Sequence, residues 1–238
     1  MSNAIYASIG RQAGLMEEMK VVSNNLANSS TTGYKADRSI FAELVAPTGT
    51  DSPSLSMGVL AGHAFELTQS SLKFSGGQFD LALQGEGYFV VQTEQGERLT
   101  RAGHFQLSAD GQLINGMGHA VMGAGGGEIT IPETATKVSI AGDGTISADG
   151  EIVGQVSIAT PNGEMQRDSN TLFISEGGYS DAETGATIIQ GALEQSNVSP
   201  VMEISRMIEV QRAYEAGQVL LEREDKRLTQ LIDAVRER

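Results

Sequence analysis

The sequence predicts an α+β protein in which discontinuous coiled-coil helices at the N- and C-termini flank a central, mainly antiparallel β domain. Three observations predict this class. Apolar residues recur at spacings of three and four near both ends of the 238-residue chain, and at a spacing of two between about 76 and 195. Residues 41–200 contain 25 of the 29 glycines. They also contain 19 acidic and 5 basic residues, so this middle part accounts for the whole net charge of −14.

The first predicted domain, residues 1–35, is an N-terminal assembly helix followed by a turn. Glu17, Glu18 and Lys20 fall off its apolar stripe, as solvated residues of an amphipathic helix do. The amides and hydroxyls that follow compete for backbone hydrogen bonds and favour helix ends and turns. We expect the stripe residues Ile5, Ile9, Met16, Met19 and Leu26 at an assembly interface, and a turn motif made of Ser23, Asn24, Asn25, Asn28, Thr32, Gly33 and Tyr34.

The second predicted domain, residues 36–75, is an extended arm with room for two short strands. Short apolar pieces alternate here with turn-forming residues, among them Pro47, Gly49, Pro53 and Gly58. The mixed composition would allow part of this arm to become ordered only against a neighbouring molecule.

The third predicted domain, residues 76–195, is the central β domain. Asp-Gly and Asn-Gly pairs separate its apolar segments and supply the positive φ angles of tight hairpins. The string Ser-Ala-Asp-Gly occurs at 108–111 and again at 147–150, which predicts the same hairpin turn twice. The expected strands are 81–83, 88–91, 105–107, 113–114, 120–122, 129–131, 138–140, 155–158 and 171–174.

The fourth predicted domain, residues 196–238, is the C-terminal assembly helix. Ser199 is a suitable N-cap, and Pro200 suits the first helical position. The apolar pattern then keeps heptad spacing through four heptads, and Ile204, Ile208 and Leu220 broaden it. The interface residues expected on this helix are Met207, Val210, Tyr214, Leu221, Leu228, Leu231 and Val235.

Apolar helices at both ends favour helix-on-helix packing, with surplus apolar surface left for further copies of the chain. The alternative is that both helices fold back onto the β domain and form one core. The charge distribution favours assembly, because the acidic excess would lie outside and the nearly neutral helices inside. An acidic chain without a basic patch argues against nucleic acid or an anionic membrane as partner, and no run approaches 18 apolar residues.

The sequence predicts no enzyme, with no catalytic, cofactor-binding or metal site. Cysteine is absent, and His63, His104 and His119 lack zinc-ligand spacing. The glycine-rich stretch 123–127 lacks the Lys and Ser or Thr of a phosphate loop, and the carboxylates of 143–151 lack EF-hand spacing. Acidic residues are too numerous to exclude a glycosidase pair by counting. A secreted β-rich module that binds or cleaves glycans, and a transient assembly factor, therefore stay open as alternatives.

Three strings of residues resemble one known family. Val22 to Asn28 followed by Thr32-Gly33-Tyr34-Lys35 resembles the N-terminal signature of bacterial flagellar rod and hook proteins. The stretch from Thr100 to Phe105 with Asp110-Gly111 resembles their central block. The strings 191–198, 207–208 and 211–214 resemble their C-terminal block. Length, opening residues and the compact middle resemble the proximal rod subgroup more than the distal rod subgroup or the hook proteins.

This resemblance implies a structural subunit of the flagellar basal-body rod. Family members are exported through the type III apparatus of the flagellum, which agrees with the lack of a recognisable cleavable signal in residues 1–14. The terminal helices would line a hollow tube in the periplasmic space, and the β domain would face outward. The implied partners are copies of the chain itself, other rod subunits and the export apparatus. The terminal segments of such subunits are often disordered before assembly.

Overall fold

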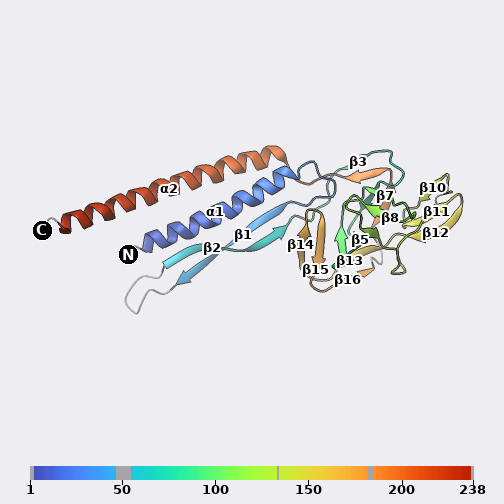
Figure 1. Ribbon diagram of the computed structural model, residues 1–238, viewed down its shortest axis with the longest axis horizontal. Coiled ribbons are helices and arrows are strands. Elements are labelled where there is room, and N and C mark those ends of the chain that lie inside the picture. The colour runs from blue at the N-terminus through green and yellow to red at the C-terminus, as the bar shows by residue number, and fades with distance from the viewer. Residues whose placement is uncertain (1–2, 47–54, 133, 182–184, 237–238) are drawn as a thin grey trace. The chain divides into compact units, whose positions relative to one another are not determined.

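A computed structural model describes residues 3–46, 55–132, 134–181 and 185–236, without the side chains of 3–6, 43–46, 55–59, 231 and 235. The chain forms two compact units, each built from separate stretches of sequence (Figure 1). Unit 1 comprises Met1–Ala27, Asp37–Glu66 and Val198–Arg238, and unit 2 comprises Asn28–Ala36 and Leu67–Asn197. Helices at both ends and antiparallel strands between them confirm the predicted α+β class.

Unit 1 contains the two helices, α1 (Asn3–Ala27) and α2 (Pro200–Arg236). They pack against each other, as predicted, and Figure 1 shows them running side by side in opposite directions. The backbone N–H of Glu203 donates to the carbonyl of Ser199 at 3.0 Å, so α2 begins where the sequence predicts. Helix α1 continues through Ser23–Ala27, so the first part of the turn motif is helical.

The rest of unit 1 is one long hairpin of β1 (Asp37–Ala46) and β2 (Leu55–Phe65), which also packs on α1. These strands of 10 and 11 residues pair along their whole length with one bulge between Ile40 and Phe41. Glycine makes the packing on α1 possible, because a Cβ on Gly14 would lie 2.9 Å from the ring of Phe41. The arm is therefore ordered on its own helix.

The described strands of unit 2 all pair antiparallel around an apolar core, which includes Leu81, Phe89, Val121 and Ile146. A nine-stranded sheet has the order β14-β15-β6-β5-β9-β8-β7, with β13 paired to β5 and β16. Its strands are β5 (Tyr88–Thr93), β6 (Gly96–Thr100), β7 (Phe105–Leu107), β8 (Leu113–Asn115), β9 (Ala120–Val121), β13 (Ile158–Pro161), β14 (Met165–Ser169), β15 (Leu172–Ser175) and β16 (Tyr179–Asp181). Smaller sheets pair β10 (Val138–Ile140), β11 (Thr145–Ala148) and β12 (Glu151–Gln155), then β17 (Thr187–Gln190) with β4 (Leu81–Gln84), and β18 (Ala192–Glu194) with β3 (Leu72–Phe74).

The repeated Ser-Ala-Asp-Gly string forms a hairpin turn both times, between β7 and β8 and between β11 and β12. In the second turn Asp149 and Gly150 both have positive φ, 50° and 95°, as a two-residue hairpin loop requires. The continuous strand expected at 155–158 is wrong, because β12 ends at Gln155 and β13 begins at Ile158. The segment 129–131 makes one isolated bridge, between Thr130 and Gln112, instead of a strand.

Candidate functional site

The paired helices of unit 1 are held by a polar contact at their centre as well as by apolar packing. Gln12 is buried, and its Nε2 donates to the backbone carbonyl of Tyr214 at 2.9 Å. Its amide occupies the space over Gly217, where an added Cβ would lie 2.2 Å from Nε2. One turn and a half further along α1, Glu18 accepts from Arg206 at 2.8 Å. The two contacts fix an antiparallel alignment of α1 and α2.

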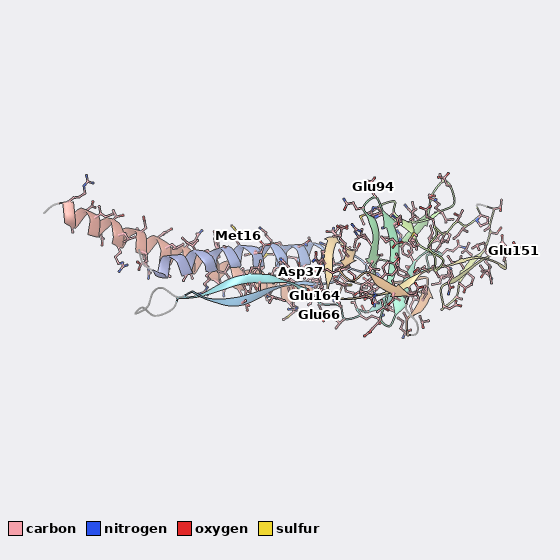
Figure 2. All side chains as sticks on the ribbon, turned by 90° about the horizontal axis from the view of Figure 1, so that it is seen from below. Met16, Asp37, Glu66, Glu94, Glu151 and Glu164 are labelled. Atoms are coloured by element: carbon pink, nitrogen blue, oxygen red, sulfur yellow. The ribbon has the colours of Figure 1, made fainter. Side chains whose placement is uncertain are left out.

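The structure divides the predicted interface residues between the seam of this helix pair and its outer surface. Val210 is buried against α1, whereas Ile9 and Met16 are 52% and 53% exposed, and Met16 is labelled in Figure 2. The side chains of Ile5, Leu231 and Val235 lie outside the described residues. The half-buried members of the set are Met19, Leu26, Met207, Tyr214, Leu221 and Leu228.

The outer surface of α2 carries further apolar residues that the predicted set does not include. Val201, Met202, Ile204 and Ile208 are exposed large hydrophobic side chains in the first three turns of the helix. Their spacing of three and four residues puts Val201, Ile204 and Ile208 on one face, away from the seam. A helical projection of the sequence would have separated this face from the seam.

The first residues of the turn motif close the end of α1 within unit 1. Asn25 is buried, and its side chain makes two hydrogen bonds to the backbone of Asp37, donating to the carbonyl at 2.8 Å and accepting from the N–H at 2.9 Å. This pair joins the end of α1 to the start of β1. Ser23 and Asn24 lie on the exposed side of the same helical turn.

The remaining residues of the turn motif belong to unit 2. Thr31 bonds to Asn28 through both backbone and side chain at 3.1 Å, which forms a closed turn. Gly33 has φ +71°, donates its N–H to the carbonyl of Glu194 at 2.8 Å, and leaves no room for a Cβ against the backbone of Ala102. Tyr34 is fully buried, and the guanidinium of Arg167 stacks 4.4 Å above its ring.

Next to this turn lies a group of polar residues that we call the clasp: Lys35, Arg101, Glu194 and Asn197. The side chains of Lys35, Arg101 and Glu194 are 1%, 4% and 0% exposed. The carboxylate of Glu194 accepts from Lys35 Nζ at 2.7 Å and from Arg101 Nη1 at 3.3 Å. Burial makes each charge depend on the others, because an uncompensated charge there would be costly.

The clasp also binds backbone groups from several segments of unit 2. Lys35 Nζ donates to the carbonyl of Thr68 at 2.7 Å, and Arg101 Nη2 donates to that of Gly85 at 2.8 Å. The N–H of Ser70 donates to Glu194 Oε1 at 3.0 Å. The strings 32–35, 100–105 and 191–198, which carry the family resemblance, contain one of these charged residues each: Lys35, Arg101 and Glu194. Their places in these strings were a sequence signal for grouping them.

Two carboxylates with possible chemistry, Asp80 and Asp149, have structural partners instead of a catalytic arrangement. The carboxylate of Asp80 accepts a hydrogen bond from the Ser75 hydroxyl at 2.5 Å and lies 2.7 Å from His104 Nδ1. Asp80 therefore stands between the serine and the histidine, whereas in a hydrolase triad the histidine stands in the middle. Asp149 accepts from two backbone N–H groups at 2.9 and 3.0 Å, and these bonds hold the pKa of its carboxyl below the usual value. Within the described ranges, no three metal-ligating side chains gather to hold an ion.

The surface of unit 2 carries many acidic side chains, in agreement with the charge distribution of the sequence. Glu94, Glu151 and Glu164 are exposed and are labelled in Figure 2. Neither described helix is apolar enough over a sufficient length to cross a membrane.

Comparison with known proteins gives three matches in chain order. Residues 5–35 match the family described as "Flagella basal body rod protein". Residues 82–148 match "Flagellar hook protein FlgE/F/G D1 domain", and residues 189–234 match "Flagellar basal body rod FlgEFG protein C-terminal". The clasp residues Lys35 and Arg101 fall in the first and second of these matches, and Glu194 and Asn197 in the third.

Relatives similar to this chain extend over nearly its whole length. The "Flagellar basal-body rod protein FlgF" of Caulobacter vibrioides is 37% identical, covering 91% of both chains. FlgF of Salmonella typhimurium is 33% identical over 90% of this chain and 91% of its own. The "Flagellar basal-body rod protein FlgG" of Bacillus subtilis is 32% identical over 99% and 100%, in an alignment of 269 positions that requires gaps in this 238-residue chain.

Proposed function

Since the chain belongs to the flagellar basal-body rod family and is a structural, non-enzymatic rod subunit, we propose that it is the proximal rod protein FlgF. Two observations support the proximal assignment. The FlgF of Caulobacter vibrioides has the higher identity, 37% against 32% for the FlgG of Bacillus subtilis. Its alignment uses 222 positions for 91% of this chain, whereas the FlgG alignment uses 269 positions for 99% of it and therefore needs more gaps. The distal rod protein FlgG is the alternative within the family.

The observation that carries the proposal for assembly is the outer apolar surface of the helix pair. The seam is already filled by α1 and α2, yet Ile9, Met16, Ile204 and Ile208 are exposed. Exposed apolar residues at helical spacing mark an interaction surface, and a rod made of repeated subunits supplies the neighbours that would cover it. We expect the predicted set on both helices to lie at or beside these contacts, and the turn motif to support them by fixing the end of α1.

Ile208→Asp tests this surface. Ile208 is 46% exposed, so the change should leave the monomer folded, but it places a charge in a desolvated subunit contact and should block incorporation into rods. Ile152→Asp is the matched control, because Ile152 is 76% exposed on unit 2. Rod incorporation is measured by recovering the subunit in isolated basal bodies. Normal incorporation of Ile208→Asp, or equal loss with Ile152→Asp, would refute the proposal.

The biological role follows from this assembly. A tube lined by the helix pairs would conduct exported subunits, and its lateral contacts would transmit torque across the periplasmic space. The export apparatus of the flagellum and the other rod subunits are the partners that this role requires. The acidic surface of unit 2 would then face outward, where mutual repulsion discourages unspecific association.

Complementation distinguishes the proximal from the distal assignment. The gene should restore motility to a strain that lacks FlgF and fail in a strain that lacks FlgG. The opposite pattern would assign the chain to the distal rod while leaving the family and the helix-pair surface unaffected.

A further inference from the structure

The chain enters and leaves unit 2 several times, and hydrogen bonds connect the places where it does so. The chain enters or leaves unit 2 at 27/28, 36/37, 66/67 and 197/198. Asn197 Oδ1 accepts from the N–H of Ala36 at 2.7 Å, and its own N–H donates to the carbonyl of Tyr34 at 3.4 Å. Its Nδ2 donates to the carbonyl of Thr68 at 3.4 Å. One side chain therefore connects three of these chain ends.

The buried charges of the clasp make this connection cooperative. Glu194 bonds Lys35 at 2.7 Å and Arg101 at 3.3 Å in buried contacts, and accepts from the N–H of Ser70 at 3.0 Å in a partly buried one. Withdrawing Lys35 would leave a buried carboxylate with one cation fewer and expose unsatisfied groups on the other segments. The clasp is therefore either closed with all its members or open, which makes it a two-state element.

We propose that closure of the clasp couples unit 2 to the pairing of α1 with α2 through the chain. Helix α1 ends at Ala27 and α2 starts at Pro200, so the partners are distant in sequence. With the clasp closed, the bond between Tyr34 and Asn197 leaves only about ten residues of chain between the helix ends. The helices then pair as a short antiparallel hairpin does, instead of across a long loop.

The size of the coupling follows from loop closure. Opening the clasp, as meant here, releases the segment 28–36 from unit 2, including the 2.8 Å bond from Gly33 N–H to the carbonyl of Glu194. The bond between Gln195 N–H and the carbonyl of Ser71 is then the next connection, which leaves a loop of about 50 residues, or about 20 if β1 and β2 stay paired. Because closure probability falls with the 3/2 power of loop length, an open clasp lowers the helix-pairing equilibrium about tenfold in the first case and about threefold in the second.

This coupling is reciprocal and does not depend on the proposed function. Thermodynamic linkage requires that loosening the helix pair opens the clasp by the same factor. A closed clasp therefore favours the paired helices about three- to tenfold over an open one, and paired helices favour the closed clasp by the same factor. The four clasp residues act by holding the chain segments at the boundary of unit 2 in position.

Amide hydrogen exchange on the full-length monomer tests the coupling. Glu194→Gln keeps the shape of the side chain and weakens both ion pairs, and it should speed exchange of α1 amides three- to tenfold. Amides of the β5–β6 hairpin should not change. Arg98→Gln is the control, because Arg98 forms another partly buried ion pair of unit 2, with Asp168 at 2.9 Å, and none of its hydrogen bonds involves the clasp.

The reverse experiment uses Arg206→Gln, which breaks the 2.8 Å ion pair to Glu18 within the helix pair. The N–H groups of Ser70 and Gly33, which bond to Glu194, should then exchange faster by a similar factor as α1. If Glu194→Gln unfolds unit 2, seen as lost protection in β5, Asn197→Ala replaces it because it removes no charge. Faster exchange at the clasp with unchanged exchange in α1 would overturn the proposal.

Discussion

Gly217→Ala is the sharpest test of how the helix pair is held. Gly217 lies in the middle of α2, where alanine normally favours the helix by about 1 kcal/mol. Here a Cβ would lie 2.2 Å from Gln12 Nε2 and 3.1 Å from its Cδ, so the amide must move. Moving it breaks the 2.9 Å bond to the carbonyl of Tyr214. We therefore expect alanine at this position to lose the stabilisation that it gives at an unobstructed helical glycine.

The magnitude follows from comparison with a second glycine. Gly10 lies in α1, and a Cβ there would meet nothing within 4 Å, so Gly10→Ala gains the helix preference without a clash. Leaving the buried Gln12 amide without its acceptor costs about 1–3 kcal/mol. The two variants should therefore differ by about 1–3 kcal/mol in the free energy of unfolding, with Gly10→Ala the more stable, because the helix preference cancels in the comparison.

Urea unfolding followed by circular dichroism at a helical wavelength measures this difference. A double-mutant cycle assigns it to the amide, since in a Gln12→Ala background the change at Gly217 should become stabilising by about 1 kcal/mol. The reasoning fails if Gly217→Ala stabilises the wild-type protein as much as Gly10→Ala does. It also fails if the Gln12→Ala background leaves the effect of Gly217→Ala unchanged.

Three further predictions concern unit 2. Gly33 and Gly76 have similar positive φ angles, +71° and +75°, so alanine imposes the same backbone strain at both. Only Gly33→Ala also places a Cβ 2.2 Å from the backbone nitrogen of Ala102, so the Gly33→Ala protein should have the lower melting temperature. Equal melting temperatures would contradict the close packing at Gly33. Two backbone N–H groups lower the pKa of the Asp149 carboxyl, so the stabilisation by this carboxylate is present above its unfolded pKa of about 4 and is lost as the pH falls through its folded pKa. When the pH is lowered below about 4, Asp149→Asn should therefore lose less stability than the wild type, as measured by urea unfolding. Burial, followed by the hydrogen bond and charge of Glu97, raises the pKa of Tyr179 to about 12, and Glu97→Gln should lower it part of the way to 10 in a ring-carbon NMR titration.

The helices were predictable because their signal is local. Apolar spacing and the Ser199-Pro200 start place α2 within one residue, and no distant contact is needed to read them. The hairpin β1–β2 was harder to predict. Its residues have no clean alternation, and the contact of Phe41 with Gly14 on α1 is one tertiary interaction that orders it.

The clasp could not be derived from spacing, because its bonds join residues far apart in the sequence. Lys35 and Glu194 are 159 positions apart, and Arg101 and Glu194 are 93 apart. A sequence pattern shows three isolated charges, and an exposed location is the ordinary expectation for each. Only the fold shows that each is buried because the others are. The turn motif likewise reads as one segment in sequence, yet Asn25 belongs to unit 1 and Gly33 to unit 2.

The unequal lengths of the helices bear on how the seam is completed. Helix α2 has 37 residues and α1 has 25, and the pairing of Gln12 with Tyr214 and of Glu18 with Arg206 places the start of α1 opposite roughly residue 222 of α2. The heptad pattern nevertheless continues beyond this point. Ile232 follows Tyr214 by 18 residues, two heptads plus four, and so lies in phase with the seam, yet it is 59% exposed. The part of the α2 seam that extends past the start of α1 therefore needs a different partner. If neighbouring subunits supply it, Ile232→Asp should leave monomer unfolding unchanged and still reduce incorporation into basal bodies, and an unaffected incorporation would mean that the extension of α2 is not a subunit contact.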